Sequence, residues 1–261
     1  MKMINEVKIV SYFIMVMAMM LTGVALPTVK CEENTTITQG KNMSLLPAIE
    51  IETGENPDAA VIWLHGLGAD GNDFAPIIPE LQLPADLAIR FIFPHAPAIP
   101  VTINGGFVMP AWYDIREMEI DRKVDTEQLM MSAEAIKRFI DREIERGIAS
   151  DRIIIAGFSQ GGAVAYQVVL GHAKQLGGLL AMSTYFATHD KLAYSEINKN
   201  ISIEIQHGIY DPVVPEKLGD SAAALLQQKG YQVNYRKYPM EHSVCAEQIR
   251  DISKWLQARL L

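Results

Sequence analysis

Residues 152–169 read Arg-Ile-Ile-Ile-Ala-Gly-Phe-Ser-Gln-Gly-Gly-Ala-Val-Ala-Tyr-Gln-Val-Val. The three isoleucines at 153–155 are typical of a short strand that is buried on both faces. The residues after Gly162 suit a packed helix, and the pattern G-x-S-x-G at 157–161 lies between the two. This stretch therefore predicts a strand, a sharp turn and a helix, with Ser159 at the tip of the turn.

A serine on so sharp a turn needs neighbours without side chains, because the backbone is strained there. Gly157 and Gly161 meet that need. The turn would lift the Ser159 hydroxyl clear of the sheet and place the Gln160 amide at a helix N-terminus, where developing negative charge is stabilised. The alternative is a glycine-rich turn with a solvent-facing serine, but the flanking strand and helix favour a nucleophile.

The composition suits one α/β domain. The chain has 261 residues, 49% of them hydrophobic, and a net charge of −8 that argues against nucleic acid as a partner. The two cysteines, Cys31 and Cys245, form neither a disulfide framework nor a zinc spacing. Cys245 continues the apolar helical spacing of residues 249–260, so we expect it to be packed in the core.

The first residues differ in character from the rest. Two lysines precede an apolar run that ends at residue 26, so residues 1–26 are predicted to be a secretory signal peptide or a membrane anchor. Residues 27–45 are polar and are predicted to be a linker to a domain at 46–261. A cleaved signal would make the protein periplasmic or secreted, whereas translation from Met43 would leave it in the cytoplasm. Any membrane contact is expected through the N-terminal segment alone.

Further along the chain, apolar runs of strand length alternate with helical patterns. This alternation predicts a mainly parallel sheet with helices on both faces and a site at the carboxyl ends of its strands. Residues 94–122 are expected to be irregular and to form a wall or lid over that site, with Met109 and Trp112 contacting the substrate. The alternative is a loop that covers the core. The strands are predicted at 59–64, 89–93, 153–155, 178–182, 201–206 and 231–238, and the main helices at 125–147, 163–169, 215–229 and 243–260, with a short one at 73–81.

A serine nucleophile needs a histidine base that is itself oriented by a carboxylate. On this type of fold the chain order is serine, acid, histidine. His242 follows the strand predicted at 231–238, and Asp211 follows the strand before it, so both are expected at the same sheet edge as Ser159. The rival histidines His172, His189 and His207 and the rival acids Asp190 and Asp220 have less suitable positions.

A second backbone donor for the oxyanion should come from the turn after an early strand. The turn His65-Gly66-Leu67-Gly68 follows the strand predicted at 59–64, and the Leu67 amide is the candidate. His65 precedes Ser159, so we expect it to brace this turn rather than to act as the base. The sequence carries no dinucleotide or P-loop motif and no metal-ligand spacing, so neither a cofactor nor a metal is expected.

Four motifs together resemble the acyl-protein thioesterase/carboxylesterase family, the phospholipase/carboxylesterase group of α/β-hydrolases. They are His65-Gly66-Leu67-Gly68-Ala69-Asp70-Gly71, Gly157-Phe158-Ser159-Gln160-Gly161-Gly162, the segment 207–215 around Asp211, and Tyr238-Pro239-Met240-Glu241-His242-Ser243. The resemblance covers about residues 45–261 and implies the α/β-hydrolase fold. It also implies Ser159, Asp211 and His242 as the triad, the Leu67 and Gln160 amides as oxyanion donors, and residues 109–114 beside the acyl-binding groove.

This resemblance implies a serine hydrolase that cleaves acyl esters or thioesters of small molecules, lipids or acylated proteins. A lysophospholipase or a peptidase would use the same machinery. A binding protein that has kept the fold and lost catalysis is the alternative from another class, although no triad residue is missing. The sequence leaves open both a monomer and a homodimer.

Overall fold

The computed structural model describes residues 44–118 and 122–261. The predicted N-terminal segment at 1–26, Cys31 and nearly all of the predicted linker lie outside the described residues. None of the helices in the described part of the chain is long and apolar enough to cross a membrane.

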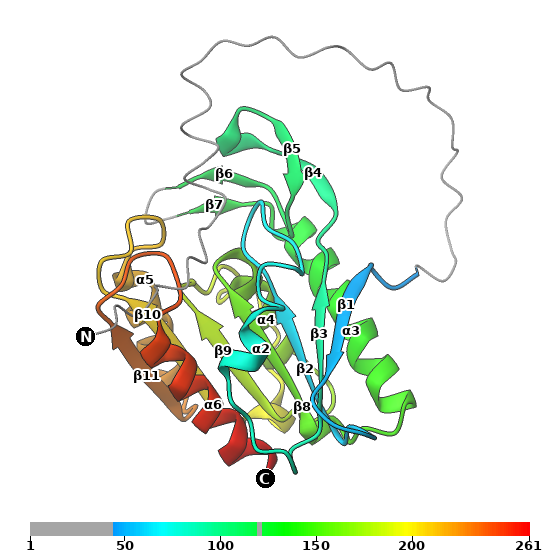
Figure 1. Ribbon diagram of the computed structural model, residues 1–261. Helices are drawn as coiled ribbons and strands as arrows, with labels where there is room; N and C mark the ends of the chain where they lie inside the picture. Colours follow the sequence, from blue (N-terminus) through cyan, green and yellow to red (C-terminus); the bar gives the residue numbers. More distant parts are fainter. Residues whose placement is uncertain (1–43, 119–121) are drawn as a thin grey trace, which may run out of the picture.

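A seven-stranded sheet forms the centre of the fold (Figure 1), with the strand order β1-β3-β2-β8-β9-β10-β11. Only β1 is antiparallel to its neighbour, so the sheet is mostly parallel, as predicted. Apart from Arg90, every residue of the five strands from β3 to β10 is buried, which fits the mainly apolar sequences of β2, β3, β8 and β9, whereas β10 also buries Glu204, Gln206 and His207. The strands span Ala48–Glu52 (β1), Ala59–Leu64 (β2), Ile89–Pro94 (β3), Ile153–Phe158 (β8), Gly178–Met182 (β9), Ile203–Gly208 (β10) and Val233–Tyr238 (β11).

Helices cover both faces of the sheet because successive strand residues point to opposite sides. In β2, Ala60, Ile62 and Leu64 belong to the core under α3, α4 and α5, whereas Ala59, Val61 and Trp63 belong to the core under α2 and α6. Figure 1 shows α6 on one face and α3 on the other. The helices span Ile77–Glu80 (α2), Thr126–Glu145 (α3), Gln160–Leu170 (α4), Glu216–Gln228 (α5) and Ala246–Leu260 (α6).

Helix α3 shows how local sequence sets an element. The Asp125 side chain accepts a hydrogen bond from the Gln128 amide, as expected of a capping box. The helix ends at Glu145, and Gly147 follows with a φ of 98°, which favours glycine. Both predicted ends of this helix are thus confirmed.

Three predictions about local structure are wrong. Residues 94–122 do not form an irregular loop throughout, because β4 (Ala98–Val101) pairs with β5 (Phe107–Pro110), and β6 (Ile115–Glu117) pairs with β7 (Lys123–Val124). The short helix α2 begins only at Ile77, after a run of turns. Helix α6 begins at Ala246, so Cys245 is its half-buried N-cap rather than a packed core residue.

Candidate active site

Ser159 lies between β8 and α4 with φ 53° and ψ −119°, a conformation that few non-glycine residues adopt. The glycines around it are required by close contacts. A Cβ on Gly157 would lie 2.5 Å from the Gly161 carbonyl oxygen, and a Cβ on Gly161 would lie 2.6 Å from the His65 carbonyl oxygen. A Cβ on Gly162 would collide with Thr184, whose hydroxyl donates to the Ser159 carbonyl oxygen. The predicted sharp turn is therefore present and leaves room for no larger residues.

The carboxylate of Asp211 is buried and uses both of its oxygens. Oδ1 accepts hydrogen bonds from the Val213 and Val214 amides at 2.9 and 2.8 Å. Oδ2 accepts a hydrogen bond from Nδ1 of His242 at 2.7 Å. The ring proton is thereby held on Nδ1, so Nε2 of His242 is left with a lone pair that can take a proton.

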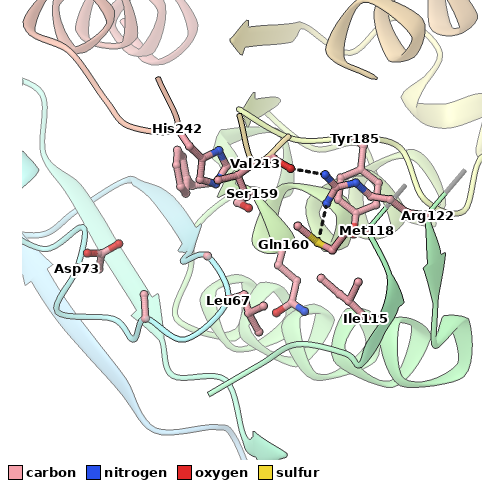
Figure 2. A pocket seen from close by; sticks show the side chains of 13 residues that line it. Leu67, Asp73, Ile115, Met118, Arg122, Ser159, Gln160, Tyr185, Val213 and His242 are labelled. Atoms are coloured by element: carbon pink, nitrogen blue, oxygen red, sulfur yellow. Dashed lines mark hydrogen bonds between the residues drawn. The ribbon is translucent and has the colours of Figure 1, made fainter. Parts of the chain in front are cut away.

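Ser159 and His242 line one narrow pocket of about 30 Å³. Leu67 and Gln160 line the same pocket (Figure 2). The His242 ring packs on Phe158, with 4.7 Å between ring centroids. Three separate loops thus bring the predicted nucleophile, base and oxyanion donors to one edge of the sheet.

The turn that carries Leu67 is braced from several sides. Nδ1 of His65 donates to the Gly66 carbonyl oxygen at 2.7 Å, and its Nε2 accepts from the Ala96 amide at 3.0 Å. The Gly68 amide donates to the Pro110 carbonyl oxygen at 2.8 Å. His65 is almost fully buried, so its predicted bracing role is confirmed.

Trp112 does not line the pocket, so the prediction that its side chain contacts the substrate is wrong. It is only 1% exposed, and its indole N–H donates to the His65 carbonyl oxygen at 2.9 Å. Its backbone amide donates to the side chain of Gln160 at 2.8 Å, and that side chain donates in turn to the Tyr113 carbonyl oxygen at 2.6 Å. Trp112 therefore fixes the loop against the site from behind. No sequence pattern indicated that the Gln160 side chain would hold this loop in place.

Met109 also lies outside the residues that line the pocket. It is 9% exposed and packs in a small apolar cluster with Val101 and Ala111, against which Leu67 is placed. Met109 therefore supports the Leu67 turn, and its predicted contact with substrate is not supported by its position. In the described part of the chain, no group of three or more His, Cys, Asp or Glu side chains could hold a metal ion.

Comparison with known proteins gives a consistent result. The family profile described as Phospholipase/Carboxylesterase matches residues 47–260. The chain belongs to the phospholipase/carboxylesterase family. Acyl-protein thioesterase 1 of Neurospora crassa is 38% identical over 227 residues, which cover 83% of this chain and 91% of the relative. Acyl-protein thioesterase 1 of Cryptococcus neoformans is 35% identical over 236 residues, covering 82% and 98%.

Solved structures agree with this assignment. The crystal structure of Zea mays acyl-protein thioesterase 2 matches with a TM-score of 0.73 and 26% identity, covering 83% of this chain and 100% of that one. The α/β-hydrolase fold is therefore confirmed. As a member of the phospholipase/carboxylesterase family, the protein is an ester-hydrolysing enzyme of the serine hydrolase class, and the non-catalytic alternative is set aside.

In this family member, His207 is close to the acid but unsuited to act as a base. It is fully buried, and Nε2 donates to the Val214 carbonyl oxygen at 2.8 Å. Burial lowers the pKa of His207, so the ring is held neutral. It therefore supports the loop that carries Asp211, and the sequence-based rejection of His207 as the base agrees with its position.

The buried ring of His65 predicts a pH dependence of stability. Burial lowers the pKa of His65 to about 4, against about 6.5 in an unfolded chain. The unfolded state therefore binds more protons between these values, and folded stability should fall as the pH drops from 6.5 to 4. The contribution lost is about 3 kcal/mol.

The measurement is denaturant unfolding at a series of pH values for the parent enzyme and for His65→Gln. The glutamine amide can keep a donor and an acceptor but does not titrate in this range. We expect a shallower loss of stability for the variant between pH 6.5 and 4. Parallel curves for the two proteins would contradict the assignment.

Proposed function

We propose that the enzyme transfers the acyl group of an ester or thioester to Ser159 and then to water, with His242 as base and Asp211 as its orienting acid. One observation carries the proposal. The strained serine shares a narrow pocket with an imidazole whose Nδ1 is hydrogen-bonded to a buried carboxylate. This arrangement supplies the three roles that a serine hydrolase needs.

In the first step Ser159 Oγ attacks the acyl carbonyl carbon while Nε2 of His242 accepts the hydroxyl proton. The tetrahedral intermediate collapses, the bond to the leaving oxygen or sulfur breaks, and His242 returns the proton to that atom. A water molecule then attacks the acyl-serine with His242 again as base, which releases the carboxylic acid and restores Ser159. Asp211 stays ionised throughout and stabilises the imidazolium.

The oxyanion would be bound by the backbone amides of Leu67 and Gln160. Neither amide donates a hydrogen bond to any acceptor among the described residues. The Gln160 amide is also the first of α4, where the helix dipole favours negative charge. One such donor typically lowers the barrier by about 2.7–4 kcal/mol.

The test of this proposal is covalent labelling. A fluorophosphonate probe should modify the parent enzyme once, and mass spectrometry of the digested protein should place the adduct on Ser159. The rate of p-nitrophenyl butyrate hydrolysis should fall in proportion to the fraction of enzyme that is labelled. An adduct on another residue, or full turnover by fully labelled enzyme, would overturn the assignment.

The relatives suggest the class of substrate. Those named above are called acyl-protein thioesterases, so we propose acylated proteins, joined through thioester or ester bonds, as substrates of this enzyme. A lysophospholipid would meet the same catalytic groups, and a substrate panel that contains both classes separates the two.

The acyl chain needs more room than the pocket at Ser159 offers. A neighbouring cavity of about 510 Å³ shares Arg122 and Tyr185 with that pocket as lining residues. Its volume lies in the range of about 300–1,000 Å³ that is usual for small-molecule sites. Its lining combines apolar side chains, among them Phe186 and Leu218, with the polar side chains of Arg122, His189, Asp190 and Ser221. We propose this cavity for the acyl chain in place of the loop around Trp112.

Filling the cavity should change the preference for chain length. Leu218 lines it from α5 and is partly buried. Leu218→Trp should raise KM for p-nitrophenyl dodecanoate about tenfold and leave KM for the acetate nearly unchanged, since each buried methylene contributes about 0.8 kcal/mol. Ile197→Trp, at an exposed site, is the matched control. An equal rise in KM for both esters would count against this cavity.

A further inference from the structure

Asp73 lines the catalytic pocket but has no role in the mechanism above. It lies in the turns between β2 and α2, and its half-buried side chain shares the pocket with Ser159 and His242. Its carboxylate accepts no hydrogen bond from any described residue. Burial and the charge of Asp70 raise the pKa of Asp73, which reflects a carboxylate without a compensating donor or cation.

The other charged side chain in the pocket is already engaged. The guanidinium of Arg122 lies 4.8 Å from the centre of the Tyr185 ring and donates to the Val213 carbonyl oxygen. Figure 2 shows Arg122 and Tyr185 on one side of Ser159, and Asp73 on the other side. Because the cavity proposed for the acyl chain lies beyond Arg122 and Tyr185, Asp73 lies on the side left for the leaving group.

We propose that Asp73 is a specificity-determining residue that binds a positive charge in the leaving group of the substrate. This inference rests on the proposed function, since the acyl chain must occupy the side of Arg122. A cation would give the Asp73 carboxylate the partner that it lacks in the protein. The shared chemistry is a fixed positive charge close to the scissile bond, as in a choline group or in a lysine or arginine of an acylated peptide.

The first test compares two thioesters that differ only in charge. Butyrylthiocholine and S-(3,3-dimethylbutyl) thiobutyrate have the same acyl group and the same shape, and both release a thiol that a disulfide reagent detects. At pH 8 the parent enzyme should favour the cationic ester in kcat/KM by about twofold to fivefold. Asp73→Asn should lose this preference, so that the ratio of its kcat/KM values for the cationic and the neutral ester approaches one.

The second test separates the sources of the charge. It uses S-butyryl cysteine peptides with either lysine or glutamine beside the acylated residue. If Asp73→Asn loses the preference only between butyrylthiocholine and its neutral counterpart, the site binds a choline-like cation. Loss for the peptide pair alone assigns it to a basic peptide, and loss for both assigns it to cations in general.

Asp86→Asn is the matched control, because Asp86 is exposed and does not line the pocket. It removes the same net charge and should keep the preference. The preference of the parent enzyme should also shrink with added salt, as a partly exposed charge interaction does. The proposal is overturned if the parent shows no preference in either pair, or if Asp73→Asn keeps it. Absence of turnover on both thioesters by the parent enzyme would instead speak against the proposed function itself.

Discussion

Ser159→Ala should lower kcat/KM for p-nitrophenyl butyrate on the order of 10⁶-fold, the scale of loss when a hydrolase loses its nucleophile. The expected reason is direct, since no acyl-enzyme can form without Oγ. Alanine also has a Cβ, so its backbone at φ 53° is as strained as that of serine, and we expect the sharp turn at residue 159 to persist. The measurement is steady-state hydrolysis, with fluorophosphonate labelling of the variant alongside.

Ser150→Ala is a suitable control for this result. Ser150 lies in the short 3₁₀ turn at the amino end of β8, at the opposite end of the same strand from Ser159. Its hydroxyl is far from the pocket, and its loss should leave activity and labelling intact. If Ser159→Ala kept parental labelling, another nucleophile would have to be sought.

Asp211→Asn should lower kcat about 10⁴-fold, because it reverses the tautomer of His242. The Val213 and Val214 amides donate to Oδ1, so the carbonyl oxygen of the asparagine must occupy that place. Its NH₂ group then faces Nδ1 of His242, which must accept rather than donate. The ring proton moves to Nε2, and the ring can no longer take the proton of Ser159.

The check on this prediction is kcat from pH 7 to 9 together with thermal unfolding, which shows whether the fold survives. Asp220→Asn removes a rival acid that lies within α5, where it is 3.9 Å from Lys237. That variant should retain nearly full activity. A loss of less than tenfold in Asp211→Asn would mean that the carboxylate does not orient the base.

The sequence predicted the parts of the site that follow strand ends. Ser159, Asp211 and His242 each come just after a strand, and parallel strands place their carboxyl ends at one edge. The pattern around Ser159 and the order of the three side chains then limited the choice of partners. These signals are local and periodic, which is why they could be found without coordinates.

What the sequence could not give is the direction of side chains in the region between β3 and α3. Apolar residues there are similar in sequence whether they point inward or outward: Trp112 is buried, whereas Phe107 is 59% exposed. The two short hairpins, β4–β5 and β6–β7, were not predicted because their sequences show no strong alternation of apolar and polar residues. The sequence indicated Asp73 only as the start of a short helix, because its place in the pocket follows from the path of the turns before α2.

The bracing of the Leu67 turn makes the catalytic site depend on contacts between distant segments of the chain. The imidazole of His65 joins the end of β2 to the segment after β3. The backbone carbonyl oxygen of His65 accepts a hydrogen bond from the indole of Trp112. Because segments far apart in the sequence hold this turn, the Leu67 amide lies beside Ser159 only when β2, the segment after β3 and the loop with Trp112 are packed together. The catalytic centre thus depends on long-range packing as well as on the local sequence around Ser159.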